Sequence, residues 1–268
     1  MNKATPVLET RNLQKSFGAV TAARDISVAV EAGTRLSVIG SNGAGKTTFV
    51  NMVTGYLKPD EGSILLAGED VTRLDPRRLT RRGIARSFQI PQLCAELTAL
   101  ENMLVARAAA EGGLPFFRPA RSAEARDAAL AVLERFGLAA IADRPVLELA
   151  GGTRKLLDIA LAMTGRPKLL MLDEPTSGVS AEEKFPFMDR IMAALDRDGV
   201  TVLFVEHDMD IVGAYADRVL AFYAGEIIAD DAPDEVLSDP AVQKYVTGTA
   251  RGTGNGTPEQ DGGGGGDA

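Results

Sequence analysis

The sequence predicts an α/β fold in which a mainly parallel sheet is covered by helices. Residues 35–39 form an expected strand that runs into a Gly-rich loop and then into a helix over 47–53, the start of a βα unit. Residues 169–172 are a continuous apolar run of strand length, as expected for a parallel strand covered on both faces. Residues 201–205 predict another strand of the same kind.

An antiparallel β subdomain is predicted beside this sheet. Residues 7–13 and 26–30 alternate apolar and polar side chains, which is typical of half-buried antiparallel strands. Residues 63–66 and 84–88 are further candidates for short strands. Later in the chain, residues 155–163 and about 181–195 predict helices that flank the apolar run at 169–172.

Residues 91–149 have helical patterns with little β signal. Thr98 and Glu101 have the spacing of a capping box, and a second helix is predicted over 123–136 with Gly137 as its C-terminal cap. We therefore predict that 91–149 is a helical subdomain inserted into an α/β core made of residues 1–90 and 150–247. Residues 248–268 form a Gly-rich tail that we predict to be disordered, because it cannot bury enough apolar surface to offset its entropy loss.

The charge balance disfavours one class of function. The chain has 268 residues, of which 25% are charged, and a formal net charge of −8. An acidic chain is a poor candidate for sequence-independent binding to nucleic acid, where Lys and Arg must displace phosphate counterions. The densest basic cluster comprises Arg77, Arg78, Arg81 and Arg82, and we interpret it as a solvated helix face in preference to a phosphate or lipid contact.

Cysteine content and hydropathy bear on the compartment. Cys94 is the only cysteine, so no intrachain disulfide can form, which fits a reducing compartment. We expect no signal peptide and no transmembrane helix, since no uncharged apolar stretch reaches about 18 residues. If the protein works at a membrane, we expect another chain to anchor it.

Residues 40–48, GSNGAGKTT, match the phosphate-binding pattern G-x-x-x-x-G-K-[ST]. Glycines let backbone N–H groups surround phosphate oxygens, and the following helix adds its N-terminal dipole. Lys46 is expected to bridge the β- and γ-phosphates, and the Thr47 hydroxyl to bind Mg²⁺. A chance Gly-rich turn is the alternative, which the flanking strand and helix disfavour. The expected nucleotide contacts are Ser41, Asn42, Gly43, Ala44, Gly45, Lys46, Thr47 and Thr48.

Two acids follow the apolar strand 169–172. Ligands bind at the carboxyl ends of strands in α/β folds, so Asp173 is expected to hold Mg²⁺ through water and Glu174 to act as general base toward the attacking water. Apolar strands followed by acids are common, and this pattern alone is weak. Its pairing with the Gly-rich loop makes it strong.

Three further features are weak by themselves. Gly151 and Gly152 precede a helix expected to begin near Arg154, which suits either an anion site or a plain helix start. His207 is the only histidine and follows a core strand, where imidazole can donate to a γ-phosphate oxygen. Gln89 ends another strand, and its amide oxygen could bind Mg²⁺ or the attacking water.

Taken in order over about residues 6–247, these motifs resemble the ABC ATPase family. The resemblance implies a P-loop NTPase core, ATP and Mg²⁺ as cofactors, Glu174, His207 and Gln89 as catalytic residues, and Phe17 stacked on adenine. It also implies that Thr47, Gln89 and Asp173 hold the metal. Residues 149–153 resemble the family's signature loop, which would place Ala150, Gly151 and Gly152 on the nucleotide of a facing subunit. Residues 178–180 resemble its D-loop.

A narrower resemblance is to the ATP-binding subunits of branched-chain amino acid importers, on residues 88–91, 96–103, 205–209 and 239–245. It implies a peripheral protein on the cytoplasmic face of the inner (cell) membrane. Its partners would be two transmembrane permease subunits, a second ATPase subunit (the same or a paralogous chain) and, through the permeases, a periplasmic or extracellular solute-binding protein. The segment around Gln89 and the helical insert would contact the permeases.

Several alternatives stay open from sequence. The ATPase of lipopolysaccharide export is a close relative, and a soluble ABC ATPase acting on nucleic acid or ribosomes is less favoured because the chain has one cassette, a short insert and an acidic balance. A non-hydrolysing regulator is disfavoured by Glu174 and His207. The solute is not determined: amides, urea or aromatic acids remain alternatives to amino acids. The choice between homodimer and heterodimer is also open.

Two positions depart from the family's pattern. Ala150 replaces the signature serine, whose hydroxyl reaches a γ-phosphate oxygen, and Thr153 replaces the usual glutamine or acidic residue. Losing a hydrogen bond to a charged group costs about 1.5–3 kcal/mol. Our hypothesis is that this loop makes the opposite site the weaker one, while the site built on Lys46 and Glu174 is fully active.

Overall fold

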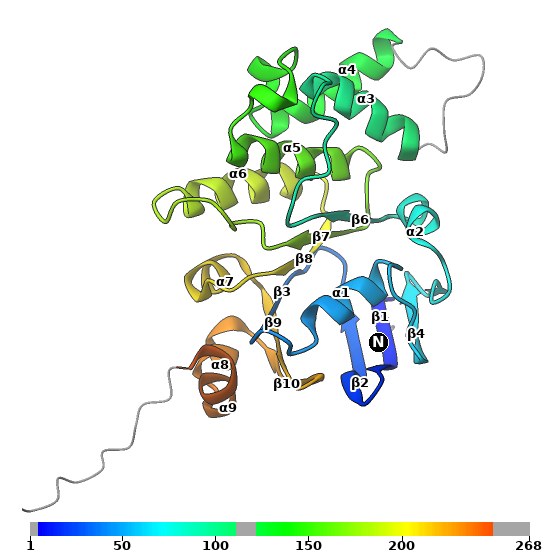
Figure 1. Ribbon diagram of the computed structural model, residues 1–268, viewed down its shortest axis with the longest axis vertical. Coiled ribbons are helices and arrows are strands. Elements are labelled where there is room, and N and C mark those ends of the chain that lie inside the picture. The colour runs from blue at the N-terminus through cyan, green and yellow to red at the C-terminus, as the bar shows by residue number, and fades with distance from the viewer. Residues whose placement is uncertain (1–4, 111–121, 249–268) are drawn as a thin grey trace, which may run out of the picture.

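The computed structural model describes residues 5–110 and 122–248, and these residues form two sheets with helices around them. The larger sheet has the strand order β10 (Glu226–Asp231), β9 (Arg218–Tyr223), β3 (Arg35–Gly40), β8 (Thr201–Val205), β7 (Leu169–Asp173) and β6 (Ile84–Ser87). Only β10 is antiparallel to its neighbour. The carboxyl ends of β3, β6, β7 and β8 therefore meet at one edge, where Gly40, Ser87, Asp173 and Val205 end their strands (Figure 1).

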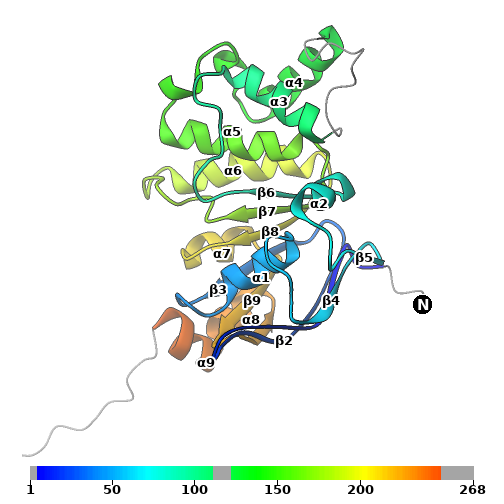
Figure 2. The same cartoon turned by 45° about the vertical axis from the view of Figure 1, so that its right-hand side comes forward.

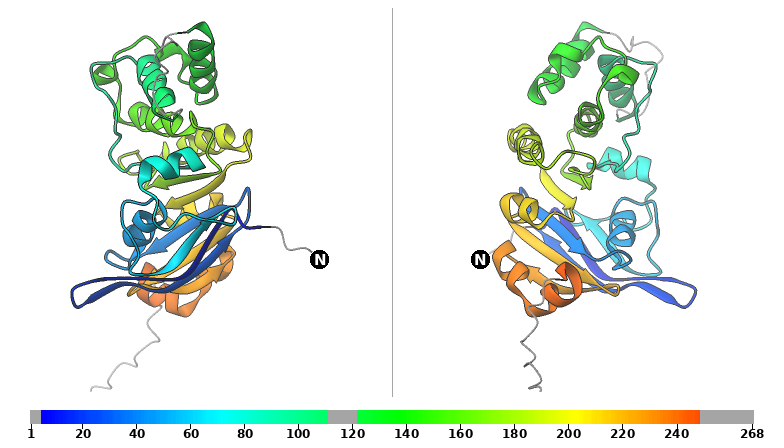
Figure 3. Two further views of the ribbon diagram at one scale, coloured as in Figure 1. Left: turned by 90° about the vertical axis from the view of Figure 1, so that its right-hand side faces the viewer. Right: turned by 60° about the vertical axis from the view of Figure 1, so that its left-hand side comes forward.

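The smaller sheet is antiparallel, with the order β2 (Val20–Val30), β1 (Leu8–Phe17), β4 (Glu61–Leu66) and β5 (Glu69–Asp70). The predicted strands at 7–13, 26–30 and 63–66 are confirmed, and all three are longer than expected. Figure 3 shows the β1–β2 hairpin extending outward beside the larger sheet.

Nine α-helices lie within the described residues. Those that surround the predicted motifs are α1 (Lys46–Val53), α2 (Pro76–Arg82), α5 (Gly151–Met163) and α6 (Lys184–Asp196). The others are α3 (Ala99–Ala110), α4 (Ala123–Arg135), α7 (Met209–Tyr215), α8 (Pro233–Ser238) and α9 (Pro240–Val242). None of the described helices is long and apolar enough to cross a membrane.

Alternate residues of β7 face two different hydrophobic clusters. Leu170 and Leu172 pack with the side chains of α5 and α6, whereas Leu169 and Met171 join a cluster with α1 and the antiparallel sheet. Figure 2 shows α5 and α6 together on one side of β6 and β7. Because both faces of β7 are buried, residues 169–172 are all apolar.

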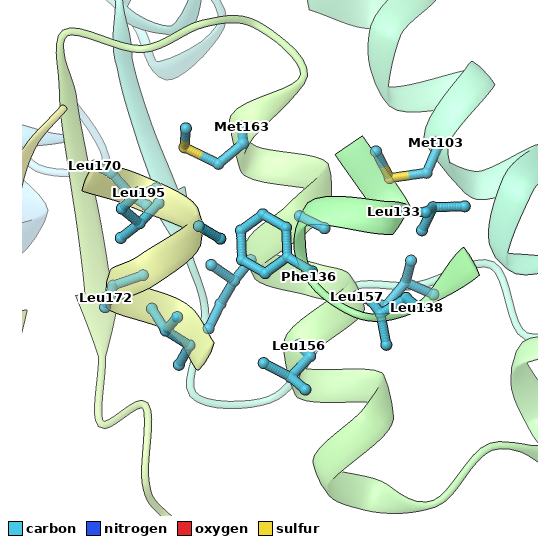
Figure 4. Close-up of a cluster of buried hydrophobic side chains, with 14 of the residues drawn as sticks. Met103, Leu133, Phe136, Leu138, Leu156, Leu157, Met163, Leu170, Leu172 and Leu195 are labelled. Atoms are coloured by element: carbon cyan, nitrogen blue, oxygen red, sulfur yellow. The ribbon is translucent and has the colours of Figure 1, made fainter. Parts of the chain in front are cut away.

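The helices of residues 99–163 share one core with the sheet. Phe136 is fully buried between α5, α6 and the loop after α4, with Met103, Leu133 and Leu157 in the same cluster (Figure 4). The capping box is confirmed: the Glu101 amide donates to Thr98 Oγ1 at 3.1 Å, and the Thr98 amide donates to Glu101 Oε2 at 3.0 Å.

Several predictions of element position differ from the structure. The helix expected near Arg154 begins at Gly151, and the helix expected from about 181 begins at Lys184. β9 and β10 have no counterpart among the predicted strands. Residues 249–268, which carry most of the Gly-rich tail predicted to be disordered, lie outside the described residues.

Candidate nucleotide-binding and hydrolysis site

The Gly-rich loop, residues 40–48, joins the end of β3 to the start of α1. Gly45 has a φ of 107°, and a Cβ there would lie 2.5 Å from the Ala22 carbonyl oxygen. Gly40 is equally restricted, since a Cβ would lie 2.6 Å from the Phe222 carbonyl oxygen. The two motif glycines are therefore required by close backbone neighbours as well as by the positive φ.

Lys46 lies inside this loop. Its Nζ donates to the carbonyl oxygens of Gly40 at 2.6 Å and Ser41 at 3.0 Å, and the residue is 6% exposed. Burial lowers the pKa of Lys46, and the carboxylates of Glu174 and Asp173 act in the opposite direction. The ammonium is thus held at the first turn of α1, near two acids.

A pocket of about 280 Å³ brings most of the predicted residues together, although Ser41 and Gln89 do not line it. It is lined by residues 42–48 of the loop and by Asp173, Glu174 and His207, which come from the ends of β7 and β8. Phe17, at the end of β1, also lines it and is 53% exposed, together with Ala22 and Val205. Segments that are far apart in the sequence therefore form one concave site.

Glu174 lies at the centre of a hydrogen-bonded group of three side chains. Its Oε2 accepts from Gln89 Nε2 at 2.6 Å, and its Oε1 lies 3.1 Å from His207 Nε2. Glu174 has a φ of 47°, in the left-handed region that non-glycine residues rarely adopt, and its amide donates to the Val205 carbonyl at 3.0 Å. This backbone conformation, pinned to β8, directs the carboxylate toward its two partners.

Asp173 has a partner that the sequence did not reveal. Arg86 Nη2 donates to Asp173 Oδ2 at 2.5 Å, and Arg86 Nη1 donates to Asn51 Oδ1 at 2.7 Å. The guanidinium lies near the rings of both Tyr56 and Phe88, 5.8 and 5.1 Å from their centroids, and these two rings also contact each other edge to face. Arg86 is part of β6, next to β7, so the pairing depends on strand order rather than on sequence distance.

Glu206 is a second unforeseen residue. It is 3% exposed, and its Oε1 accepts from the Thr176 amide at 2.9 Å and from Thr176 Oγ1 at 2.8 Å. Its Oε2 accepts from the His207 amide at 3.2 Å. One buried carboxylate thereby ties the segment after Glu174 to the segment that carries His207.

The signature loop, residues 149–153, lies apart from this pocket. Ala150 is the N-cap of α5 and makes no side-chain capping bond, and Ala150 and Gly151 are exposed. Neither they nor Gly152 line the pocket that contains Lys46 and Glu174. Within one chain, Ala150, Gly151 and Gly152 therefore lie apart from the other predicted site residues.

Comparison with known proteins agrees with this geometry. A family model described as ABC transporter matches residues 23–177. The chain is 37% identical over 249 residues to the probable branched-chain amino acid transport ATP-binding protein LivG of Archaeoglobus fulgidus, covering 90% of this chain and 95% of that one. It is 36% identical over 253 residues to the high-affinity branched-chain amino acid transport ATP-binding protein BraF of Pseudomonas aeruginosa, covering 91% and 99%.

Solved structures give the same result. The ADP conformation of an ATP-binding cassette of an ABC transporter matches with a TM-score of 0.79 at 35% identity, over 89% of this chain and 97% of that one. A dimeric post-hydrolysis state of another cassette, bound to ADP and Pi, matches with a TM-score of 0.72 at 26% identity, over 84% and 98%. The predicted α/β fold with a P-loop NTPase core is confirmed. The chain belongs to the ABC transporter family and is an ATP-binding ATPase subunit of that family.

Proposed function

We propose that this chain powers an importer for branched-chain or related amino acids by coupling closure of an ATPase dimer on ATP to solute movement through partner permeases. The proposed ATP hydrolysis rests on one observation: Glu174 contacts both Gln89 and His207 beside the Gly-rich loop. The solute class rests on the relatives, which are named as branched-chain amino acid transport proteins.

The chemistry follows from the charges of the site. The Glu174 carboxylate would accept a proton from water as the water attacks the γ-phosphorus, and ADP would leave with the electrons of the broken P–O bond. His207 and Gln89 would orient Glu174 and contact the γ-phosphate or the water. Lys46 would exchange its carbonyl partners for phosphate oxygens, and Phe17 would stack on adenine.

The residues present suit a magnesium ion. Thr47 and Asp173 line the same pocket and offer hard oxygen donors, the kind that Mg²⁺ prefers. Arg86 takes only Oδ2 of Asp173, so the carboxylate keeps a second oxygen for the ion or its water. Thr47, Asp173 and Gln89 would hold the ion, which would neutralise charge on the β- and γ-phosphates.

A second ATPase subunit is part of the proposal. Ala150, Gly151 and Gly152 are at the N-terminus of α5 and outside their own chain's pocket, so they are free to cover the nucleotide of a facing chain. A solved relative is described as dimeric in its post-hydrolysis state. The facing chain would be a second copy or a paralogue.

A groove of about 570 Å³ is the proposed contact for a permease. Its walls come from α2, β6, α3 and α5, and it includes Phe88 and Gln92 on either side of Gln89. Arg77 and Arg81 stand at its edge, and neither guanidinium forms an ion pair with a described residue. A cytoplasmic permease segment with apolar side chains and an acidic residue would match this groove in shape and charge. The remaining apolar lining comprises Ala85, Ala106, Ala109, Ala110, Leu161 and Ala162.

The permeases would hold the chain on the cytoplasmic face of the inner (cell) membrane and link it to a periplasmic or extracellular solute-binding protein. No contact of this chain with the binding protein is required. Solute choice would then belong to the partner chains, which is why the relatives' names are the best guide to it.

Two measurements test the proposal. We expect the purified chain to hydrolyse ATP in a Mg²⁺-dependent manner, and Glu174→Gln to abolish turnover while it dimerises with ATP on gel filtration. In vesicles that also contain the partner permeases and binding protein, ATP-dependent uptake of leucine is expected. Uptake of urea or benzoate but not leucine would overturn the solute class, and nucleotide binding without turnover in the assembled complex would overturn the motor.

A further inference from the structure

We propose that Lys155 and Asp158 of α5 are positioning residues for ATP hydrolysis, which hold the segment around Gln89 and the backbone of Glu174 to the helix that begins at the signature loop. The inference rests on the proposed hydrolytic roles of Gln89 and Glu174. Neither Lys155 nor Asp158 lines the nucleotide pocket, so each would act through another residue.

Asp158 fixes the chain on both sides of Gln89. Its Oδ2 accepts from Ser87 Oγ at 2.7 Å and from the Phe88 amide at 3.1 Å, and its Oδ1 accepts from the Gln92 amide at 3.0 Å. Both carboxylate oxygens are thus used on one short segment, 87–92. Asp158 is 6% exposed and Ser87 is buried, so loss of the carboxylate would leave the Ser87 hydroxyl without its acceptor in a place that water does not reach.

Lys155 joins the same segment to Glu174. Its Nζ donates to the Glu174 carbonyl oxygen and lies 3.5 Å from the Gln89 carbonyl oxygen. The side chain therefore contacts the backbone of both residues whose side chains meet at 2.6 Å. Lys155 and Asp158 are one helical turn apart, so a single face of α5 holds both ends of this pair.

The charges around Lys155 explain why a buried lysine is retained there. The residue is 4% exposed, and burial lowers its pKa. Four carboxylates, those of Glu206, Glu174, Asp158 and Asp173, act in the opposite direction. The Lys155 ammonium thus lies among the carboxylates of the site and partly neutralises them. Its removal would leave their negative charge with less compensation.

The position of α5 gives this arrangement a functional meaning. The helix begins at Gly151, directly after Ala150, and Lys155 follows one turn later. A rigid helix that carries the loop offered to the facing subunit therefore also holds Gln89 and Glu174 of its own chain. A displacement of about 1 Å at a reacting group can cost a hundredfold in rate, so this attachment is sufficient to affect turnover.

The test compares Lys155→Met and Asp158→Asn with the native full chain, in the assembly that hydrolyses ATP. We expect kcat to fall about tenfold or more, with the KM for ATP within about twofold, because the phosphate contacts of the Gly-rich loop are untouched. Asn102→Ala is the matched control. Asn102 is 2% exposed and holds the backbone of Cys94 and Thr98 in the same way, but it contacts neither Gln89 nor Glu174. It should lower Tm and leave kcat within about twofold.

Two further readouts separate positioning from general stability. In the Gln89→Ala background, Lys155→Met should lose much of its effect on kcat, because residues that act through one another are not additive. Without nucleotide, Asp158→Asn should speed amide hydrogen exchange at Phe88 and Gln92 and leave exchange in β8 unchanged. Full additivity with Gln89→Ala, or a kcat within twofold of the native value in both variants, would overturn the proposal. A native chain without turnover would instead overturn the proposed function, and the exchange measurement would still report on the Asp158 contacts.

Discussion

His207 Nε2 lies 3.1 Å from Glu174 Oε1, although the two residues are 33 positions apart in the chain. β7 and β8 are neighbouring parallel strands, and each of these residues follows the carboxyl end of its strand. The only histidine of the chain is therefore in contact with the proposed general base.

Replacing this histidine should affect the chemical step more than nucleotide binding. For His207→Ala we expect kcat to fall by about 10- to 100-fold, since Glu174 loses an orienting partner, while the affinity for ATP stays within about twofold. The measurement is steady-state turnover beside equilibrium binding of ATP. Asp210→Ala, an exposed change three residues further on, should behave as the native chain. A His207→Ala chain with native kcat would contradict the role.

A serine in the signature loop should raise turnover of the assembled complex. Ala150→Ser restores a hydroxyl at the exposed N-cap of α5, and we expect turnover of the assembled complex to rise by about 3- to 10-fold if Ala150 weakens the facing site. A gain in the intrinsic stability of α5 would raise Tm without changing kcat, so both are measured. Unchanged turnover would contradict the hypothesis of a weakened opposite site.

The groove edge offers a matched pair of variants on one helix. Arg77 and Arg81 are unpaired among the described residues and line the groove, whereas Arg78 and Arg82 pair with Asp75 and Glu69. All four arginines are exposed on α2.

Reversal of the two unpaired charges should weaken assembly with the permeases. For Arg77→Glu with Arg81→Glu we expect about a tenfold loss of affinity, because an exposed ion pair of up to about 1 kcal/mol is lost and the new carboxylates repel the acidic residue of the permease segment. ATPase activity of the isolated chain should not change. Arg78→Glu with Arg82→Glu is the control, and an equal loss of assembly in both pairs would contradict the groove as the docking site.

Tyr215 should ionise late in an alkaline titration. Burial raises the pKa of Tyr215 to about 12, and its hydroxyl donates to Asp189 Oδ1 at 2.7 Å, which acts in the same direction. Because the folded-state pKa lies above the unfolded value of about 10, the stabilisation is complete below pH 10 and is lost as pH rises through 12.

The measurement is phenolate absorbance at high pH beside denaturant unfolding. Tyr215→Phe should remove the component that titrates near pH 12, and its free energy of unfolding should fall less between pH 10 and 12 than that of the native chain. Tyr223→Phe should retain the late component. If Tyr215→Phe also retains it, the assignment is wrong.

The sequence by itself determined the parts of the site that are contiguous in the chain. Residues 40–48 contain every element of a phosphate loop, and local sterics around Gly45 require that residue type. The pairing of an apolar strand with Asp173 and Glu174 is equally local, since burial of β7 on both faces needs continuous apolar side chains. The family's fold could be predicted for the same reason.

Tertiary structure decided which of these parts meet. Contact of Glu174 with Gln89 and His207 needs the order β8, β7, β6, and a parallel sheet sets that order by long-range packing that no local pattern encodes. In the sequence, nothing distinguishes Lys155 and Asp158 from ordinary polar residues of a helix. Only the packing of α5 against β6 buries them among backbone groups, and buried charges persist where partners of this kind are available.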